Sequence, residues 1–161
     1  MPRFLRTLAL LLPVLALTAC GSATISPSTP PPGAVVRAIL FYSPTCPHCQ
    51  KVISEDLPPL LEQYGDHLQI IGVNISVAGG QALFQAANDY FAVAGQRRGA
   101  VPFLAIGETY LIGSADIPNR FPGIIEEGLK QGGIDWPAIP GLAEVIASIP
   151  PTPTGGAPAP T

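Results

Sequence analysis

Apolar residues in the central part of the chain recur with two periods, one typical of strands and one typical of helices. Short apolar or alternating runs predict strands at residues 35–42, 67–76, 102–106 and 109–113. Helical spacing predicts a helix that begins at Pro47 and is kinked or broken at Pro58-Pro59, and further helices at residues 81–95, 118–131 and 142–149. This order predicts an α/β domain whose mixed sheet of about four strands is flanked by helices.

The first twenty residues have the order of an export signal. Arg3 and Arg6 precede an apolar run at residues 8–17, which is too short to span a bilayer as a permanent helix. The ending Leu-Thr-Ala-Cys resembles the bacterial lipobox, in which the cysteine is lipidated. We therefore expect a signal peptide at residues 1–19 and a lipid on Cys20; the alternative is that Cys20 is only a small residue at the end of the leader.

Two stretches poor in large apolar residues flank the predicted domain. Residues 20–34 are small, polar and proline-rich, as in a flexible linker. Residues 150–161 contain only Pro, Thr, Gly and Ala, which is typical of a disordered tail. We therefore expect one domain at residues 35–149, with its core at residues 35–131, held to a membrane by the lipid and the linker.

The charge pattern argues against nucleic acid as a partner. The 161 residues are 47% hydrophobic and 12% charged, with a formal net charge of −3. Loss of Arg3 and Arg6 with the leader leaves six basic residues against eleven acidic ones. Arg97 and Arg98 form the only adjacent basic pair, which is typical of a solvated loop.

Cys46 and Cys49 enclose Pro47 and His48, and they are the two cysteines that remain if Cys20 carries a lipid. A thiolate, and not a thiol, attacks a disulfide, and Cys-x-x-Cys motifs lower the thiol pKa to roughly 3.5–7.5. A helix that begins at Pro47 points backbone N–H groups at the first sulfur, and the missing N–H of Pro47 costs nothing there. We expect Cys46 to be the nucleophile, Cys49 the resolving thiol, and His48 a stabiliser of the thiolate.

The motif Phe-Tyr-Ser-Pro-Thr-Cys-Pro-His-Cys at residues 41–49, followed by Gly-Ala-Val-Pro-Phe at residues 99–103, resembles the thioredoxin superfamily. The resemblance covers residues 35–131 and implies a minimal thioredoxin-like fold. It also implies that Val101-Pro102 is a cis peptide whose backbone pairs with an extended substrate beside the dithiol. Because Cys-Pro-His-Cys is similar to the motif of DsbA-type oxidases, we expect oxidation of substrate thiols, with reductase or isomerase activity as the alternative.

Three features depart from these families. Leu40 stands six residues before Cys46, where the families often keep a buried carboxylate, so the proton of Cys49 must pass to water or another group. Only 24 residues separate Ser76 from Val101, too few for the helical domain of DsbA-type oxidases, and the extra N-terminal strand and helix have no room before residue 35. The minimal core is also similar to modules that accompany bacterial vitamin K epoxide reductase homologues, which reoxidise such dithiols and are expected redox partners.

Three other uses of the motif stay open. A metal site could combine the two cysteines with His48 or His67, although structural zinc normally takes four ligands. A purely structural disulfide would close too small a loop to stabilise the fold much. A lipid-anchored binding module with an incidental dithiol is the third alternative.

The remaining expectations concern partners and side chains outside the motif. We expect no cofactor beyond the cysteine pair, no resident metal, and a monomer on the outer face of the cell membrane or in the periplasm that acts on protein thiols and disulfides. His67 is expected at the surface, and Glu108 and Asp116 as solvated charges. Aromatic residues expected in the core are Phe84, Tyr90, Phe91 and Trp136.

Overall fold

The computed structural model describes residues 30–148; the predicted signal peptide, Cys20, most of the linker and the predicted tail lie outside these residues. In chain order the elements are β1 (Val36–Tyr42), α1 (Pro47–Lys51), the π-helical turn η1 (Val52–Asp56), α2 (Leu57–Tyr64), η2 (Gly65–His67), β2 (Leu68–Asn74), α3 (Ala78–Tyr90), η3 (Gly95–Arg97), β3 (Phe103–Ile106), β4 (Thr109–Ile112), α4 (Gly113–Lys130) and α5 (Leu142–Ser148). Within the described part, no helix is long and apolar enough to cross a membrane.

The four strands form one mixed sheet, as the sequence predicts, and their order in the sheet is β2-β1-β3-β4. β1 and β2 run parallel, because the helical segment from α1 to α2 carries the chain back to the start of the sheet. β3 is antiparallel to β1, and a tight turn joins it to β4. The end of β1 and the start of β3 are thereby neighbours, with Phe41 opposite Phe103.

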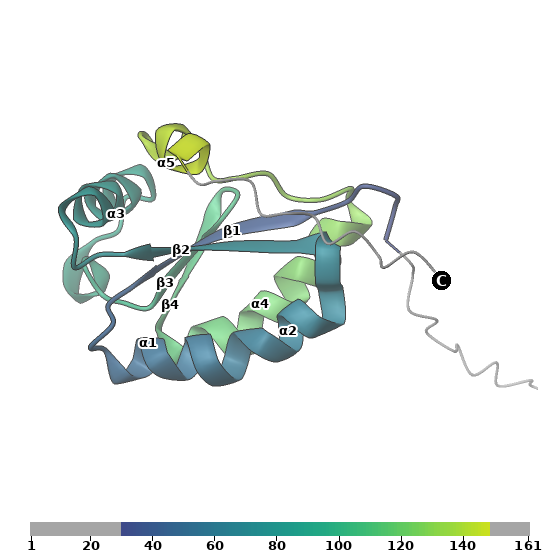
Figure 1. The fold of residues 1–161 in the computed structure, drawn as a ribbon, viewed down its shortest axis with the longest axis horizontal. Coiled ribbons are helices and arrows are strands. Elements are labelled where there is room, and N and C mark those ends of the chain that lie inside the picture. Colours follow the sequence, from purple (N-terminus) through teal and green to yellow (C-terminus); the bar gives the residue numbers. More distant parts are fainter. Residues whose placement is uncertain (1–29, 149–161) are drawn as a thin grey trace, which may run out of the picture.

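Helices cover both faces of the sheet (Figure 1). Alternate residues of β1 enter the two core clusters: Ala38 and Leu40 pack with α2 and α4, whereas Ile39 and Phe41 pack with α3 and α5. This alternation is the period of two that buries a strand on both faces. The layers are α1, α2 and α4 on one side, and α3 and α5 on the other.

Of the kink or break predicted at Pro58-Pro59, the break does not occur, because the helical run continues through both prolines. Both prolines fall in the first turn of α2, after a widened π-helical turn in which the N–H of Leu57 donates to the carbonyl of Val52. Proline has no N–H, so an uninterrupted α-helix would lose two successive backbone hydrogen bonds here. After the wider turn, both prolines stand at the start of α2, where an N–H has no partner within the helix to lose. Cys49 and α2 therefore belong to one helical run, from Pro47 to Tyr64.

Two predicted helix boundaries also need correction. α3 ends at Tyr90, not near residue 95, because Ala92 adopts a positive φ of 49° and turns the chain. α4 begins at Gly113, five residues before the predicted start at Pro118, which lies inside the helix. Ile117 and Phe121 are fully buried on this helix, so the apolar stripe outweighs the hydrogen bonds that proline removes. The extra first turn of α4 reaches the cysteine motif.

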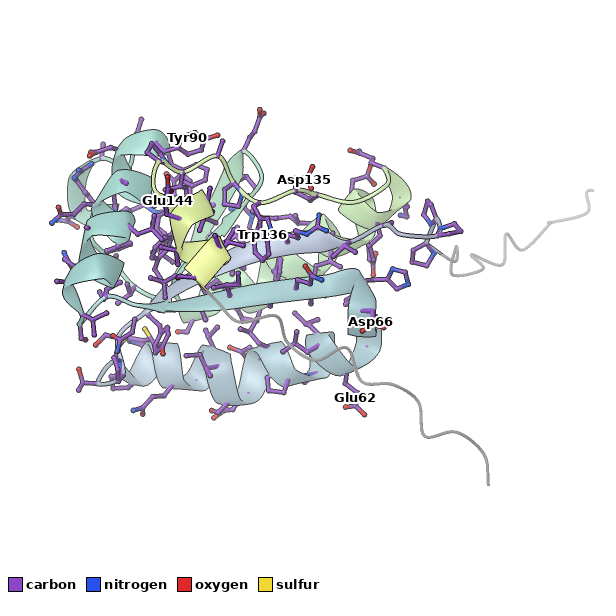
Figure 2. The ribbon with its side chains drawn as sticks, turned by 45° about the horizontal axis from the view of Figure 1, so that its top comes forward. Glu62, Asp66, Tyr90, Asp135, Trp136 and Glu144 are labelled. Carbon is purple, nitrogen blue, oxygen red and sulfur yellow. The ribbon has the colours of Figure 1, made fainter. Side chains whose placement is uncertain are left out.

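The segment after α4 returns along the sheet towards α5. Ile134 forms a parallel bridge with Val36, and Arg37 pairs with Asp135 at 2.8 Å. Figure 2 shows Trp136 on the α5 side of the sheet, where it packs partly buried against the core cluster that contains Phe84. Tyr90, which the sequence predicts in the core, is 40% exposed.

Candidate active site: the Cys46 and Cys49 dithiol

Cys46 is the N-cap residue of α1. The chain leaves β1 and turns at Ser43, whose carbonyl accepts a hydrogen bond from the N–H of Cys46 at 3.1 Å. Pro47 is the first helical residue, as predicted, and the Sγ of Cys46 accepts the N–H of Cys49 at 3.4 Å. The first sulfur thus takes the place of the oxygen that usually caps a helix, and it faces the positive end of the helical run.

The two thiols have different surroundings. Cys46 is half-buried, whereas Cys49 is fully buried. Burial raises the pKa of the Cys49 thiol from its ordinary value of 9.0 to about 11; a backbone hydrogen bond from Ser43 opposes the increase, and the neighbouring Cys46 adds to it. Cys49 therefore holds its proton at neutral pH, and Cys46 is the sulfur that an incoming thiol can reach.

We expect the free energy of unfolding of the reduced chain to fall as pH rises from about 9 to about 11. The pKa of Cys49 is raised in the folded state, so the stability that it contributes is complete below pH 9 and is lost as pH rises through the folded pKa of about 11. Two pKa units correspond to at most about 2.7 kcal/mol. Urea denaturation at stepped pH measures the fall, and an equal fall in the Cys49→Ser chain, which keeps every other titrating group, would contradict it.

The Val101-Pro102 segment lies against the first sulfur. Its peptide bond is cis, as the resemblance implies, and the thiol of Cys46 donates to the carbonyl of Val101 at 3.9 Å. Pro102 is buried, and its carbonyl accepts the N–H of Gly113 at 2.8 Å. Residues 55 positions apart in the sequence therefore meet at one site, where the end of β1 adjoins the start of β3.

His48 reaches a residue that the sequence analysis does not single out. Its Nδ1 lies 3.0 Å from the hydroxyl oxygen of Ser114, and both side chains are accessible to solvent. Ser114 stands on the first turn of α4, a turn that the helix start predicted at Pro118 leaves out. A predicted start at Gly113 would have included Ser114 in the helix.

Several other residues considered from the sequence lie outside the dithiol site. Leu40 is buried among apolar side chains, so β1 supplies no carboxylate under Cys49. The Nδ1 of His67 lies 2.7 Å from the carbonyl oxygen of Ala34, at the start of β2, and Asp116 pairs with Arg97 at 3.1 Å. Among residues 30–148, no three His, Cys, Asp or Glu side chains gather closely enough to hold a metal ion.

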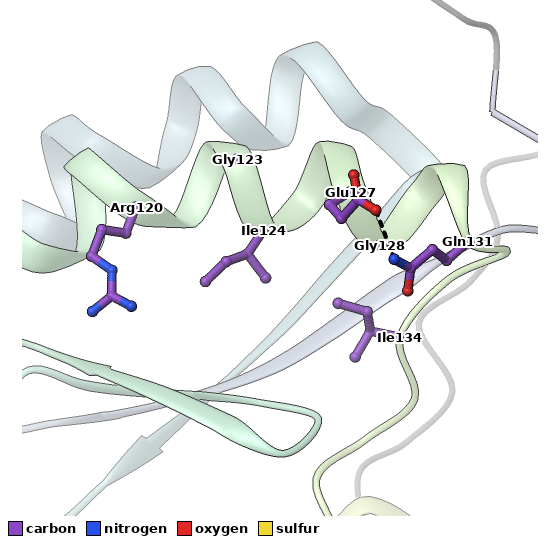
Figure 3. A pocket seen from close by; sticks show the side chains of 7 residues that line it. All are labelled: Arg120, Gly123, Ile124, Glu127, Gly128, Gln131 and Ile134. Atoms are coloured by element: carbon purple, nitrogen blue, oxygen red, sulfur yellow. Dashed lines mark hydrogen bonds between the residues drawn. The ribbon is translucent and has the colours of Figure 1, made fainter.

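A groove of about 430 Å³ lies between α4 and the segment that carries Ile134 (Figure 3). Its lining includes the apolar Ile124 and Ile134 and the charged Arg120 and Glu127. Gly128 allows the close approach of Ile134, since an added Cβ would lie 2.6 Å from the Cδ1 of that residue. The groove shares no lining residue with the dithiol.

Neither a protein-family model nor a curated protein matches the sequence. The four-stranded order, with its parallel β1 and β2 and its closing hairpin, decides the fold class. The fold is thioredoxin-like.

Solved structures of similar fold include two thioredoxins. The thioredoxin of Trichomonas vaginalis is 20% identical, with a TM-score of 0.40 over 59% of this chain and 80% of its own. Oxidised thioredoxin O2 of Arabidopsis thaliana is 24% identical, with a TM-score of 0.41 over 61% and 78%. A chain from the structural work on thiol resolution in yeast mitochondrial 1-Cys peroxiredoxin is 18% identical, with a TM-score of 0.37 over 61% and 79%.

Proposed function

We propose that the chain is a thiol-disulfide oxidoreductase that oxidises substrate thiols through Cys46 and Cys49. One observation carries the proposal: the half-buried sulfur of Cys46 is capped by the N–H of Cys49 and faces the carbonyl of Val101, while the thiol of Cys49 is buried and protonated. An accessible sulfur with a stabilised anion, next to a protected partner thiol, is the arrangement that disulfide exchange requires.

The exchange proceeds in two balanced steps. In the first, a substrate thiolate attacks the Sγ of Cys46 in the oxidised pair; the bond to Cys49 breaks, a mixed disulfide forms, and Cys49 takes up one proton. In the second, another thiolate of the substrate attacks the substrate sulfur of the mixed disulfide, and Cys46 leaves as the thiolate. Two electrons pass from the substrate to the dithiol, and the substrate gains a disulfide.

The surrounding residues have roles that follow from their contacts. The cap from the N–H of Cys49, together with the neighbouring His48, stabilises the leaving thiolate of Cys46, which makes the oxidised form the stronger oxidant. Pro47 starts the helix that provides this cap. Within residues 30–148 the N–H of Val101 has no hydrogen-bond partner, so Val101 and Pro102 present a free donor for the backbone of an extended substrate.

The oxidising direction requires an external oxidant. We infer that a membrane redox protein such as a vitamin K epoxide reductase homologue accepts the two electrons and restores the Cys46 and Cys49 disulfide. Lipidation at Cys20 would place the domain beside such a partner, on the outer face of the cell membrane or in the periplasm. The support for this location is the order of residues 1–20, with two arginines, an apolar run and a terminal Leu-Thr-Ala-Cys.

Disulfide exchange between the oxidised full chain and a synthetic dithiol peptide tests the proposal. Mass spectrometry should show that the peptide loses two hydrogens as the chain gains two. Unchanged masses for both molecules, over a time in which small disulfides exchange freely, would contradict a redox role.

A further inference from the structure

The loop that carries Val101 is attached to α3 by a buried amide. We call residues 95–102, between α3 and β3, the cis-proline loop. Asn88, on the last turns of α3, is 2% exposed and is the one buried polar or charged residue in the described part of the chain. A buried polar side chain is kept only where its hydrogen bonds are made, so its partners indicate what it holds.

Both ends of the Asn88 amide are bonded. The Nδ2 donates to the carbonyl of Phe84 at 2.8 Å, and the Oδ1 accepts the N–H of Gly99 at 3.1 Å. The backbone carbonyl of Asn88 accepts the N–H of Val93 at 2.9 Å. The first bond fixes the side chain to its own helix, and the second fixes the loop two residues before Val101.

Two side-chain attachments of the loop are exposed ion pairs, and at its far end the carbonyl of Pro102 accepts the N–H of Gly113. Arg97 pairs with Asp116 of α4, and Arg98 pairs with Asp89 of α3. All four side chains are at least 40% accessible, so solvent screens these pairs and each contributes little. The bond from Gly99 is therefore the one side-chain attachment of the loop that ends on a buried polar group, Asn88.

We propose that Asn88 is a positioning residue for the thiol-disulfide exchange, a role that rests on the proposed function. By holding Gly99, it keeps the carbonyl of Val101 against the sulfur of Cys46 and leaves the Val101 N–H, which has no hydrogen-bond partner within residues 30–148, for the backbone of a substrate. A substrate that lies along the loop needs both groups in place, whereas a small reagent needs only the sulfur. Loss of the amide therefore slows exchange with peptides selectively.

Two substitutions at Asn88 separate positioning from stability. Asn88→Leu keeps the number and branching of the side-chain heavy atoms and removes both hydrogen bonds. Asn88→Asp keeps an acceptor for Gly99 but loses the donor to Phe84, so it costs stability while it keeps the loop attached. Leu129→Ala, in the core on the opposite face of the sheet, is the matched control for stability alone.

The full chain is assayed for exchange with the dithiol peptide and, in the reduced form, for alkylation of Cys46 by iodoacetamide. We expect Asn88→Leu to slow peptide exchange at least about tenfold, because small displacements of a substrate clamp have effects of this size. Alkylation should stay within about twofold of the wild type, and Asn88→Asp should keep peptide exchange within about threefold. Equal losses in both reactions, or equal peptide rates in Asn88→Leu and Leu129→Ala, would overturn the proposal.

Amide hydrogen exchange in the wild type gives a result that depends on no variant. The N–H of Gly99 should exchange at least about tenfold more slowly than the N–H of Gly95 in the same loop, because the N–H of Gly95 has no hydrogen-bond acceptor within residues 30–148. Equal rates would overturn the attachment itself. A wild type that exchanges no disulfide with the peptide would instead overturn the proposed function, and with it the role of Asn88.

Discussion

Replacing Cys46 with serine is expected to abolish disulfide transfer to the dithiol peptide. The half-buried sulfur of Cys46 is the one that a substrate can attack, and Cys49 is fully buried beneath it. A serine oxygen can still cap the helix but forms no disulfide. The rate of peptide oxidation should therefore fall to the rate measured without the protein. The fold should remain, because no core side chain changes.

Two further serine variants complete this test. Cys20→Ser makes the same chemical change at the third cysteine and should leave the transfer rate in solution unchanged. Cys49→Ser should retain Cys46 and accumulate mixed disulfides with substrates, because the resolving thiol is gone. If Cys49→Ser traps no adduct in cells while zinc or copper co-purifies with the wild type, the metal alternative is correct instead.

Gly80→Ala is expected to give the largest loss of stability among single methyl additions. A Cβ at Gly80 would lie 1.9 Å from the carbonyl oxygen of Asn74 and 2.8 Å from its carbon, where α3 packs on the end of β2. Backbone atoms cannot rotate away as a side chain can, so α3 must shift from the sheet. We expect the free energy of unfolding to fall by about 3 kcal/mol or more.

The neighbouring glycine is the control for this substitution. A Cβ at Gly79 would meet nothing within 4 Å, so Gly79→Ala should leave packing unchanged and stabilise the helix by up to about 1 kcal/mol. Urea denaturation midpoints of the two variants should therefore move in opposite directions. Equal destabilisation by both would show that the contact of Gly80 with Asn74 does not decide the packing of α3.

The elements and the cysteine motif could be predicted because their signals are local. A short apolar run gives β1, and the Cys-x-x-Cys spacing before a helix gives Cys46 its place at the N-cap. Local rules also caused the errors. Proline usually begins a helix, which hid the first turn of α4 and with it Ser114, but the buried stripe through Ile117 and Phe121 continues past Pro118.

The contacts that complete the site join segments far apart in the chain. No pattern within α3 shows that Asn88 will bond Gly99, and none near His48 points to Ser114. Such pairs depend on how the layers pack, which a single sequence does not reveal. The missing carboxylate was predictable, because the residue six positions before Cys46 is Leu40, which the structure places in the core.

The redox potential of the Cys46 and Cys49 pair in the full chain tests the oxidase proposal most directly. It is measured by equilibration with glutathione buffers and by counting oxidised against reduced chains. We predict a potential above about −200 mV, towards the range of about −180 to −120 mV for protein disulfide isomerase and DsbA. A potential near −270 mV, the value for thioredoxin, or an oxidised fraction that does not respond to glutathione, would contradict it.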